Sequence, residues 1–165
     1  MKELIEKYPF LNYYYDNGKL VFEDEKRRIE DNYYTKFEGY GWDKLWKKYL
    51  KELFKIYDTL SEAKKKNFKI VFVDASKNYL EVETSNKEID NILSDRIKKM
   101  SLWVCNKCGN LFKNEKGELT IYRSRRTNVA FCKDCALEES LGDIDSEFKV
   151  MTTDNIDPWL EELNE

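Results

Sequence analysis

The stretches "WVCNKCGNLF" (residues 103–112) and "AFCKDCALEE" (residues 130–139) contain all four cysteines of this chain, which has no histidine. The thiols form two Cys-x-x-Cys pairs, which are separated by a single intervening segment, 109–131. Four thiolates at such a spacing can complete a closed tetrahedral shell around one metal ion. We therefore predict a structural Zn²⁺ with the ligands Cys105, Cys108, Cys132 and Cys135.

Three other uses of paired cysteines stay open at this point. A redox Cys-x-x-Cys pair usually occurs once, at a helix start in a thioredoxin-like unit. Disulfides require an oxidising compartment. An iron–sulfur cluster uses four cysteines, but this spacing is less usual for one. Zinc agrees best with two pairs in one short segment.

The segment around the cysteines is expected to fold only with its metal. Gly109 follows the first pair, where its free backbone allows a tight turn, and a second turn is predicted at residues 114–117. The second pair is expected to open a short helix. About 35 residues cannot bury enough apolar surface to offset their chain entropy, so removing the metal should unfold residues 101–140 first.

Upstream of the cysteines, the pattern alternates between strands and helices. Residues 68–84 predict two strands around a turn at residues 75–78. Ser85 and Glu88 predict a capping box, which opens a helix. The expected buried stripe of that helix consists of Ile89, Ile92, Leu93, Ile97 and Met100.

A longer amphipathic helix is predicted from Gly41, because apolar residues recur there every three or four positions up to Leu60. We interpret its aromatic residues, Trp42 and Trp46 included, as core. Residues 11–23 predict a β-hairpin around Asp16–Gly18, and residues 2–8 a short helix. Residues 23–32 form a charged connector or a short helix.

These elements predict an α+β fold, in which two helices cover antiparallel β-hairpins and a small four-cysteine finger of the zinc-ribbon or treble-clef kind is appended. The predicted domains are an α+β body (1–100), the zinc finger (101–140) and an acidic C-terminal tail with a short helix (141–165). Their formal charges are uneven: residues 1–100 carry +2, residues 101–136 carry +4 and residues 137–165 carry −9.

Composition and motifs argue against several classes of function. The sequence shows no glycine-rich phosphate loop and no serine-centred elbow, so we expect no enzyme activity. Residues 1–15 have no long apolar run, so we expect neither an export signal nor a membrane anchor, and a cytoplasmic location. An overall charge of −3 is not that of a protein whose whole surface binds nucleic acid.

A local basic cluster nevertheless keeps nucleic acid as an alternative partner. Tyr122, Arg123, Arg125 and Arg126 follow one another on the finger, with Lys113, Lys116 and Lys133 nearby. Arginines can bind phosphates while an aromatic ring stacks on a base. A small domain with little core can equally have a charged surface without such a role.

The C-terminal stretch "DNIDPWLEELNE" (residues 154–165) predicts a short acidic helix with Asp157 as N-cap and Pro158 at its first position. Trp159, Leu160 and Leu163 lie on one face of it. Such a helix either folds back onto the body, with residues 148–153 as an edge strand, or inserts Trp159 into a groove of a partner protein.

The order of these motifs resembles a loose family of uncharacterised small proteins of phages and bacterial mobile elements. The matching pieces are Tyr8-Pro9-Phe10, Gly41-Trp42, the helix with Ile89 and Ile92, and the closing Cys-x-x-Cys-Gly and Cys-x-x-Cys pairs, over roughly residues 1–136. The resemblance implies a metal-binding finger and a phage or mobile-element context, hence the host cytoplasm, and no particular reaction.

We therefore expect a non-enzymatic, zinc-stabilised accessory protein that docks on a host or phage protein. Trp159, Leu160 and Leu163 are the candidate contacts. The acidic tail and the mobile-element context suggest an inhibitor of a bacterial defence nuclease, whose carboxylates imitate phosphates.

Overall fold

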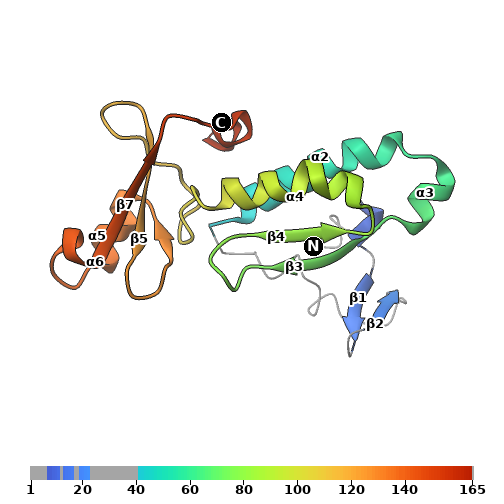
Figure 1. The fold of residues 1–165 in the computed structure, drawn as a ribbon, viewed down its shortest axis with the longest axis horizontal. Helices are drawn as coiled ribbons and strands as arrows, with labels where there is room; N and C mark the ends of the chain where they lie inside the picture. The colour runs from blue at the N-terminus through green and yellow to red at the C-terminus, as the bar shows by residue number, and fades with distance from the viewer. Residues whose placement is uncertain (1–6, 12, 17–18, 23–40, 165) are drawn as a thin grey trace.

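The structure, a computed structural model, describes residues 7–11, 13–16, 19–22 and 41–164. It mixes helices with three small antiparallel sheets. The molecule is elongated: two long helices and a two-stranded sheet occupy one end, and the cysteine-bearing segment occupies the other (Figure 1). The predicted α+β class is confirmed at this level.

Helix α2 (Asp43–Thr59) is the centre of the core. Its apolar positions are spaced three or four apart, so they fall on one face of the helix. Leu45, Trp46, Tyr49, Leu50 and Leu53 are buried there, and Trp42 just before the helix is 4% exposed. The interpretation of the two tryptophans as core residues is confirmed.

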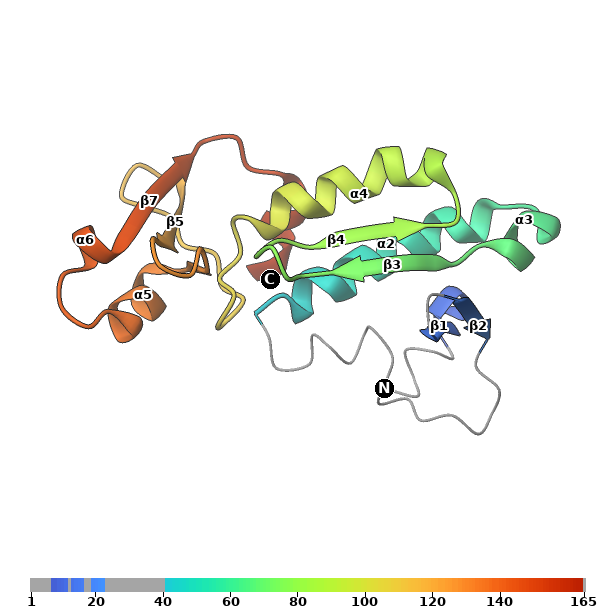
Figure 2. The same cartoon turned by 60° about the horizontal axis from the view of Figure 1, so that its bottom comes forward.

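Strands β3 (Ile70–Asp74) and β4 (Glu81–Thr84) pair antiparallel, as the sequence predicts, with Asn78 at positive φ in their turn. Helix α4 (Lys87–Ser101) packs on β4 and α2, so both helices lie over the same sheet (Figure 2). The turn is tied to α4, because the Leu80 N–H donates to the Ser101 hydroxyl at 2.8 Å. A short helix, α3 (Glu62–Asn67), connects α2 to this sheet.

Two details of the predicted helix at residues 85–100 are wrong. Its N-cap is Asn86, whose side chain accepts from the Glu88 and Ile89 N–H groups. Ser85 is not available, because its hydroxyl accepts from the Lys69 N–H and donates to the Asn67 carbonyl. Ile92 is 64% exposed, since the contact with α2 and β4 uses only the narrower stripe through Ile89 and the later apolar positions.

The N-terminal part contributes aromatic side chains to the same core. The 3-10 helix η1 (Pro9–Leu11) buries Phe10 and Leu11, and the Phe10 ring lies 5.7 Å from the Phe68 ring. Strands β1 (Tyr13–Asp16) and β2 (Lys19–Phe22) pair antiparallel, as predicted. The predicted helix at residues 2–8 falls mostly, and the connector at residues 23–32 entirely, outside the described residues.

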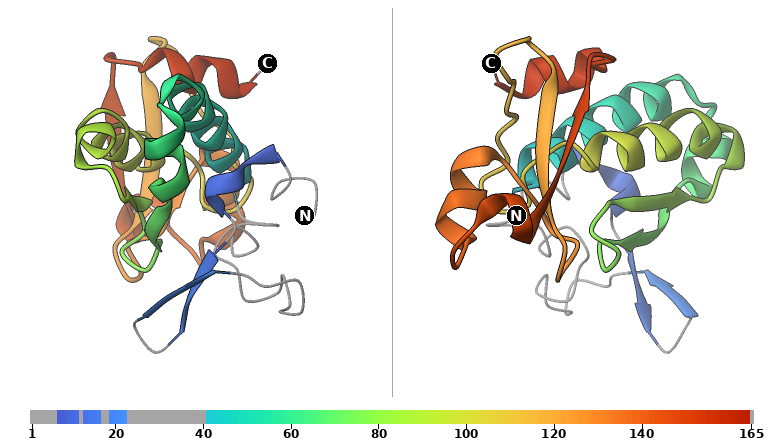
Figure 3. Two further views of the ribbon diagram at one scale, coloured as in Figure 1. Left: turned by 90° about the vertical axis from the view of Figure 1, so that its right-hand side faces the viewer. Right: turned by 60° about the vertical axis from the view of Figure 1, so that its left-hand side comes forward.

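At the other end, a three-stranded sheet has the order β6-β5-β7, from β5 (Leu119–Ser124), β6 (Ala130–Phe131) and β7 (Phe148–Thr153). Helices α5 (Lys133–Glu139) and α6 (Ile144–Glu147) lie between β6 and β7 in the chain. Strand β7 belongs to the predicted acidic tail, yet it pairs with all of β5 (Figure 3). The finger and the start of the tail therefore share one sheet.

The chain ends with α7 (Pro158–Glu161) and the 3-10 helix η4 (Glu162–Asn164), which return to the body and contact α2. Asp157 is the N-cap and Pro158 the first helical residue, as predicted. Trp159, Leu160 and Leu163 are buried in the same core as α2 and α4. The folded-back alternative is the one that the structure adopts.

Candidate metal centre

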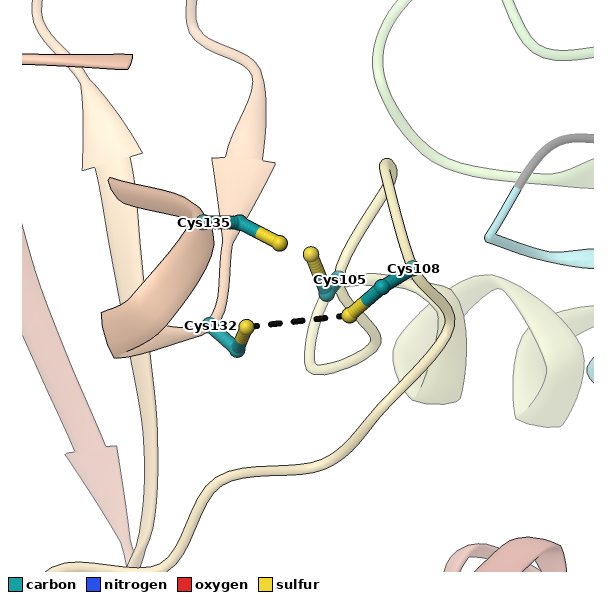
Figure 4. Close-up of side chains that lie close together, drawn as sticks. All are labelled: Cys105, Cys108, Cys132 and Cys135. Carbon is teal, nitrogen blue, oxygen red and sulfur yellow. Dashed lines mark hydrogen bonds between the residues drawn. The ribbon is translucent and has the colours of Figure 1, made fainter. Parts of the chain in front are cut away.

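The four cysteines meet at the junction of two elements that are well separated in the sequence. Cys105 and Cys108 lie in the loop after α4, and Cys132 and Cys135 lie at the N-cap and in the first turn of α5. All four sulfurs point toward one another (Figure 4). Every pair of Sγ atoms is within 4.8 Å, so the group can hold a metal ion.

The sulfur spacing agrees with a single tetrahedral ion. Bonds of ~2.3 Å at tetrahedral angles place neighbouring sulfurs about 3.8 Å apart. The Sγ atoms of Cys108 and Cys132 are separated by 3.7 Å. Cys105, Cys132 and Cys135 are buried and Cys108 is exposed, so the site lies just below the surface.

The loop that carries the first pair, residues 105–110, is closed by its own backbone. The Gly109 N–H donates to the Cys105 carbonyl at 2.9 Å, and the Cys105 N–H donates to the Asn110 carbonyl. The Asn110 N–H donates to the Cys108 sulfur at 3.4 Å. Gly109 has a φ of 76°, which an L side chain rarely adopts, so the predicted glycine turn is confirmed.

This loop is held from two sides. The Asn106 N–H donates to the Ala130 carbonyl of β6, which joins the first cysteine pair to the strand before the second. From the other side, the Gly41 N–H donates to the Asn106 carbonyl at 2.9 Å, which joins the loop to the start of α2. The sequence alone does not single out Gly41 for this contact, because its partner lies far away along the chain.

Burial changes the acidity of the thiols. It raises the pKa of Cys132 to about 11 and raises that of Cys135 further above the usual thiol range. For Cys105, burial acts in the same direction, but backbone N–H groups around its sulfur outweigh it and lower the pKa. A metal ion that binds all four as thiolates must therefore displace protons, which makes its affinity depend on pH.

Two ion pairs join the two segments that carry the cysteine pairs. Lys107 Nζ lies 3.0 Å from Glu138 and 2.7 Å from Glu139, so it joins the first cysteine loop to α5. Hydrogen bonds to these two carboxylates raise the pKa of Lys107. The three side chains are well exposed, so their contribution to stability is small.

The basic cluster predicted on the finger separates into residues that contact the protein itself and residues that are exposed. Arg123 is half-buried, donates to the Asn128 and Leu102 carbonyls, and has a pKa lowered by burial. Tyr122 packs against Phe112 with ring centroids 6.4 Å apart. Arg125 and Arg126 are exposed in the β5–β6 turn, and no described side chain forms an ion pair with either.

Lys113, Lys116 and Lys133 are also exposed, and only Lys113 has an acidic partner among the described residues, Glu161 at 3.6 Å. Two further tail carboxylates, Asp157 and Glu162, pair with the body rather than with the finger. Asp157 accepts two hydrogen bonds from Arg96, at 2.7 and 2.8 Å, and Glu162 pairs with Lys48. The Arg96 guanidinium also lies 3.9 Å from the Trp159 ring centroid.

A groove of about 680 Å³ lies between the β5–β6 turn and the segment from α5 to β7. We call it the arginine groove and define it by Arg125, Arg126, Val129, Phe131, Leu141 and Phe148. Its apolar lining includes the Phe131 and Phe148 rings, which lie edge to face with centroids 6.0 Å apart. Leu141 is 90% exposed.

No protein-family model matches the chain, and no curated protein or solved structure is significantly similar to it. The resemblance to phage and mobile-element proteins therefore stays a prediction. Within the described part of the chain, no helix has both the length and the apolar character needed to cross a membrane.

Proposed function

We propose that this protein is a non-enzymatic binding protein that is stabilised by Zn²⁺ and docks on another protein. A single ion is favoured over an iron–sulfur cluster, because sulfurs within 4.8 Å leave no room for several irons and their bridging sulfides. The order of cysteine loop, β5–β6 pair and helix α5 supports a treble-clef-like finger rather than a zinc ribbon. Four thiolates fill the coordination shell of zinc, which favours a structural role.

The observation that carries the docking function is the arginine groove. It combines apolar side chains, among them a 90% exposed leucine, with two arginines that have no ion-pair partner among the described residues. Exposed apolar patches mark protein interaction sites, where arginine is enriched. A partner segment with an apolar residue next to an acidic one complements this groove.

The experiment compares what three tagged, zinc-loaded versions of the full chain retain from bacterial lysate, before and after nuclease treatment. The first is the wild type. Arg125→Glu with Arg126→Glu reverses the charge of the groove. Lys64→Glu with Lys66→Glu makes the same change on α3, at the other end of the molecule, and is the matched control. We expect one stoichiometric protein that survives nuclease and is lost only from the groove variant.

Nucleic acid is the second candidate, and the exposed pair Arg125 and Arg126 favours it. Against it, Arg123 is engaged with two backbone carbonyls, and Glu139 and Glu147 line the same groove. If the wild type retains many proteins that disappear after nuclease treatment, and the groove variant does not retain them, the function would be nucleic-acid binding.

The target class stays part of the proposal. A defence nuclease as partner is supported by the resemblance to mobile-element proteins and by the acidic C-terminal segment. The structure reduces the number of carboxylates free to imitate phosphates, since Asp157 and Glu162 already pair with Arg96 and Lys48. Asp143, Asp145 and Asp154 are exposed on either side of β7 and are the remaining candidates.

A further inference from the structure

Strand β7 has an outer edge that no described segment pairs with. In the sheet order β6-β5-β7 it is a terminal strand of six residues, with β5 on its other side (Figure 2). Lys149, Val150 and Thr152 are exposed. Val150 is 45% exposed, although it is one of the large apolar residues of the chain.

The hydrogen-bond pattern of β5 shows which backbone groups of β7 are free. The Thr120 N–H donates to the Phe112 carbonyl and the Ser124 N–H to the Val129 carbonyl, so the even-numbered residues of β5 face away from β7. In an antiparallel pair, the residues opposite them also turn their N–H and C=O groups outward. The register places Phe148, Val150 and Thr152 in these positions.

Of these three residues, Phe148 uses its N–H for the Ile144 carbonyl at the end of α6. The N–H and C=O groups of Val150 and Thr152 have no partner among the described residues. They form a short row of donors and acceptors spaced as a β-ladder requires. An exposed row of this kind is a template for an added strand unless it is blocked.

Charge indicates what kind of strand fits. Asp143, Asp145 and Glu147 precede β7 and Asp154 follows it, so acidic side chains stand at both ends of the edge, with Arg125 and Arg126 in the groove next to Glu147. The Glu147 carboxylate is partly engaged with the Ser140 hydroxyl and the Leu141 N–H. Asp145 and Asp154 are exposed, and no described basic side chain pairs with either.

Self-pairing of two copies is disfavoured by the same charges. A two-fold antiparallel arrangement of β7 with β7 brings the acidic segment before one strand beside Asp154 after the other, at both ends of the pair. Like charges placed opposite each other across a strand pair are destabilising. The complementary occupant is therefore a different sequence.

We propose that the outer edge of β7 binds an extended segment of a partner protein in which basic residues flank a short β-branched stretch. Main-chain hydrogen bonds to Val150 and Thr152 supply the ladder, and the acidic ends select the flanks. This inference rests on the proposed function, since the occupant is a protein, and it concerns the edge at Val150 and Thr152, whereas the arginine groove reaches β7 at Phe148.

The test uses the full, zinc-loaded chain with ¹⁵N label and capped synthetic peptides as probes. The peptide KKTVTVKK has basic flanks, and EETVTVEE keeps the same centre with acidic flanks. We expect the basic peptide to bind about tenfold more tightly, with a difference that shrinks as salt is added. Amide shifts and exchange protection should concentrate at Val150 and Thr152.

Two protein variants separate the backbone from the side chain. Val150→Pro removes the outward N–H but no bond of the β5–β7 ladder, and proline is tolerated on a strand edge. Val150→Thr keeps the N–H and is the matched control. We expect Val150→Pro to weaken binding about tenfold and Val150→Thr to leave it unchanged. N-methylation of the peptide on alternate residues makes the same test without changing the protein.

The charge part is tested with Asp145→Asn and Asp154→Asn, which should remove the preference for basic flanks. Equal binding of the two peptides, shifts located elsewhere, or unchanged binding by Val150→Pro would overturn the inference. Dimerisation that depends on protein concentration and is abolished by Val150→Pro would also overturn the inference, since the β7 edge would then bind a second copy of this chain. If the variant Arg125→Glu with Arg126→Glu keeps its partner, that result counts against the proposed function. It does not count against binding at the β7 edge, because this variant leaves Val150 and Thr152 unchanged.

Discussion

Replacing Gly41 by alanine should destabilise both the body and the metal centre, although Gly41 is neither a ligand nor a core side chain. A Cβ added at this position would lie inside the contact distance of the Cys105 carbonyl oxygen, 2.6 Å from the Gly109 nitrogen and 2.8 Å from the Asn106 carbonyl carbon. Nonbonded heavy atoms are comfortable at ~3.5 Å. The cysteine loop would therefore have to retreat by about 1.5 Å from the start of α2 to relieve the closest of these contacts.

The atoms in the way are all backbone, so no side chain can rotate to make room. Overpacking of this kind costs about 1–3 kcal/mol, and the Gly41 N–H bond to the Asn106 carbonyl, worth about 1 kcal/mol, would be lost as well. We expect a decrease of about 2–4 kcal/mol in the free energy of unfolding of the zinc-loaded protein. Because the displaced loop carries Cys105 and Cys108, zinc affinity should fall too.

Urea unfolding followed by circular dichroism measures the first effect, and competition with a chromogenic chelator measures the second. Gly142→Ala is the matched control, since its nearest neighbour is a flexible carboxylate oxygen 3.8 Å away. If Gly41→Ala unfolds within about 0.5 kcal/mol of both wild type and Gly142→Ala, the contact between α2 and the cysteine loop does not exist in solution.

Three further predictions test other parts of the structure. Trp159→Ala should lower the free energy of unfolding by about 3–5 kcal/mol, because this side chain is only 7% exposed. Leu141→Ala, at a residue that is 90% exposed, should change it by less than about 0.5 kcal/mol. Equal effects of the two substitutions would show that α7 does not dock on the body. The hydrogen bonds from Arg96 lower the pKa of Asp157 below its ordinary value of 3.8, so their stabilisation is present above that pH and is lost as the pH falls through the lower folded-state pKa. Asp157→Asn keeps the helix cap but removes the charge. The variant should therefore be less stable than wild type by a constant amount near neutral pH, and the difference should vanish in acid. A difference that does not depend on pH would contradict the ion pair. Removal of the metal by a chelator should expose residues 101–140 to proteolysis before α2 and α4, and unchanged cleavage there after complete zinc loss would refute a structural metal.

The sequence predicted the local elements well where one physical pattern dominated. The spacing of Leu45 and Leu53 located α2, and the two cysteine pairs located the metal centre, because ligand chemistry leaves few other uses for four thiols. The sequence-based prediction was wrong where two neighbouring residues could both serve as the N-cap of a helix. Ser85 and Asn86 are both good N-caps, and the sequence does not show that Ser85 is already bonded to residues 67 and 69.

The sequence by itself determined the composition of the site and the order of the helices and strands, since both depend on residues close together in the chain. The tertiary structure alone decided that β7 pairs with β5, that Trp159 stacks on Arg96, and that Gly41 touches the cysteine loop. Each of these contacts joins segments that are distant from each other along the chain. Periodicity and propensity carry no information about such pairings, because they are selected by the shape and charge of surfaces that exist only after folding.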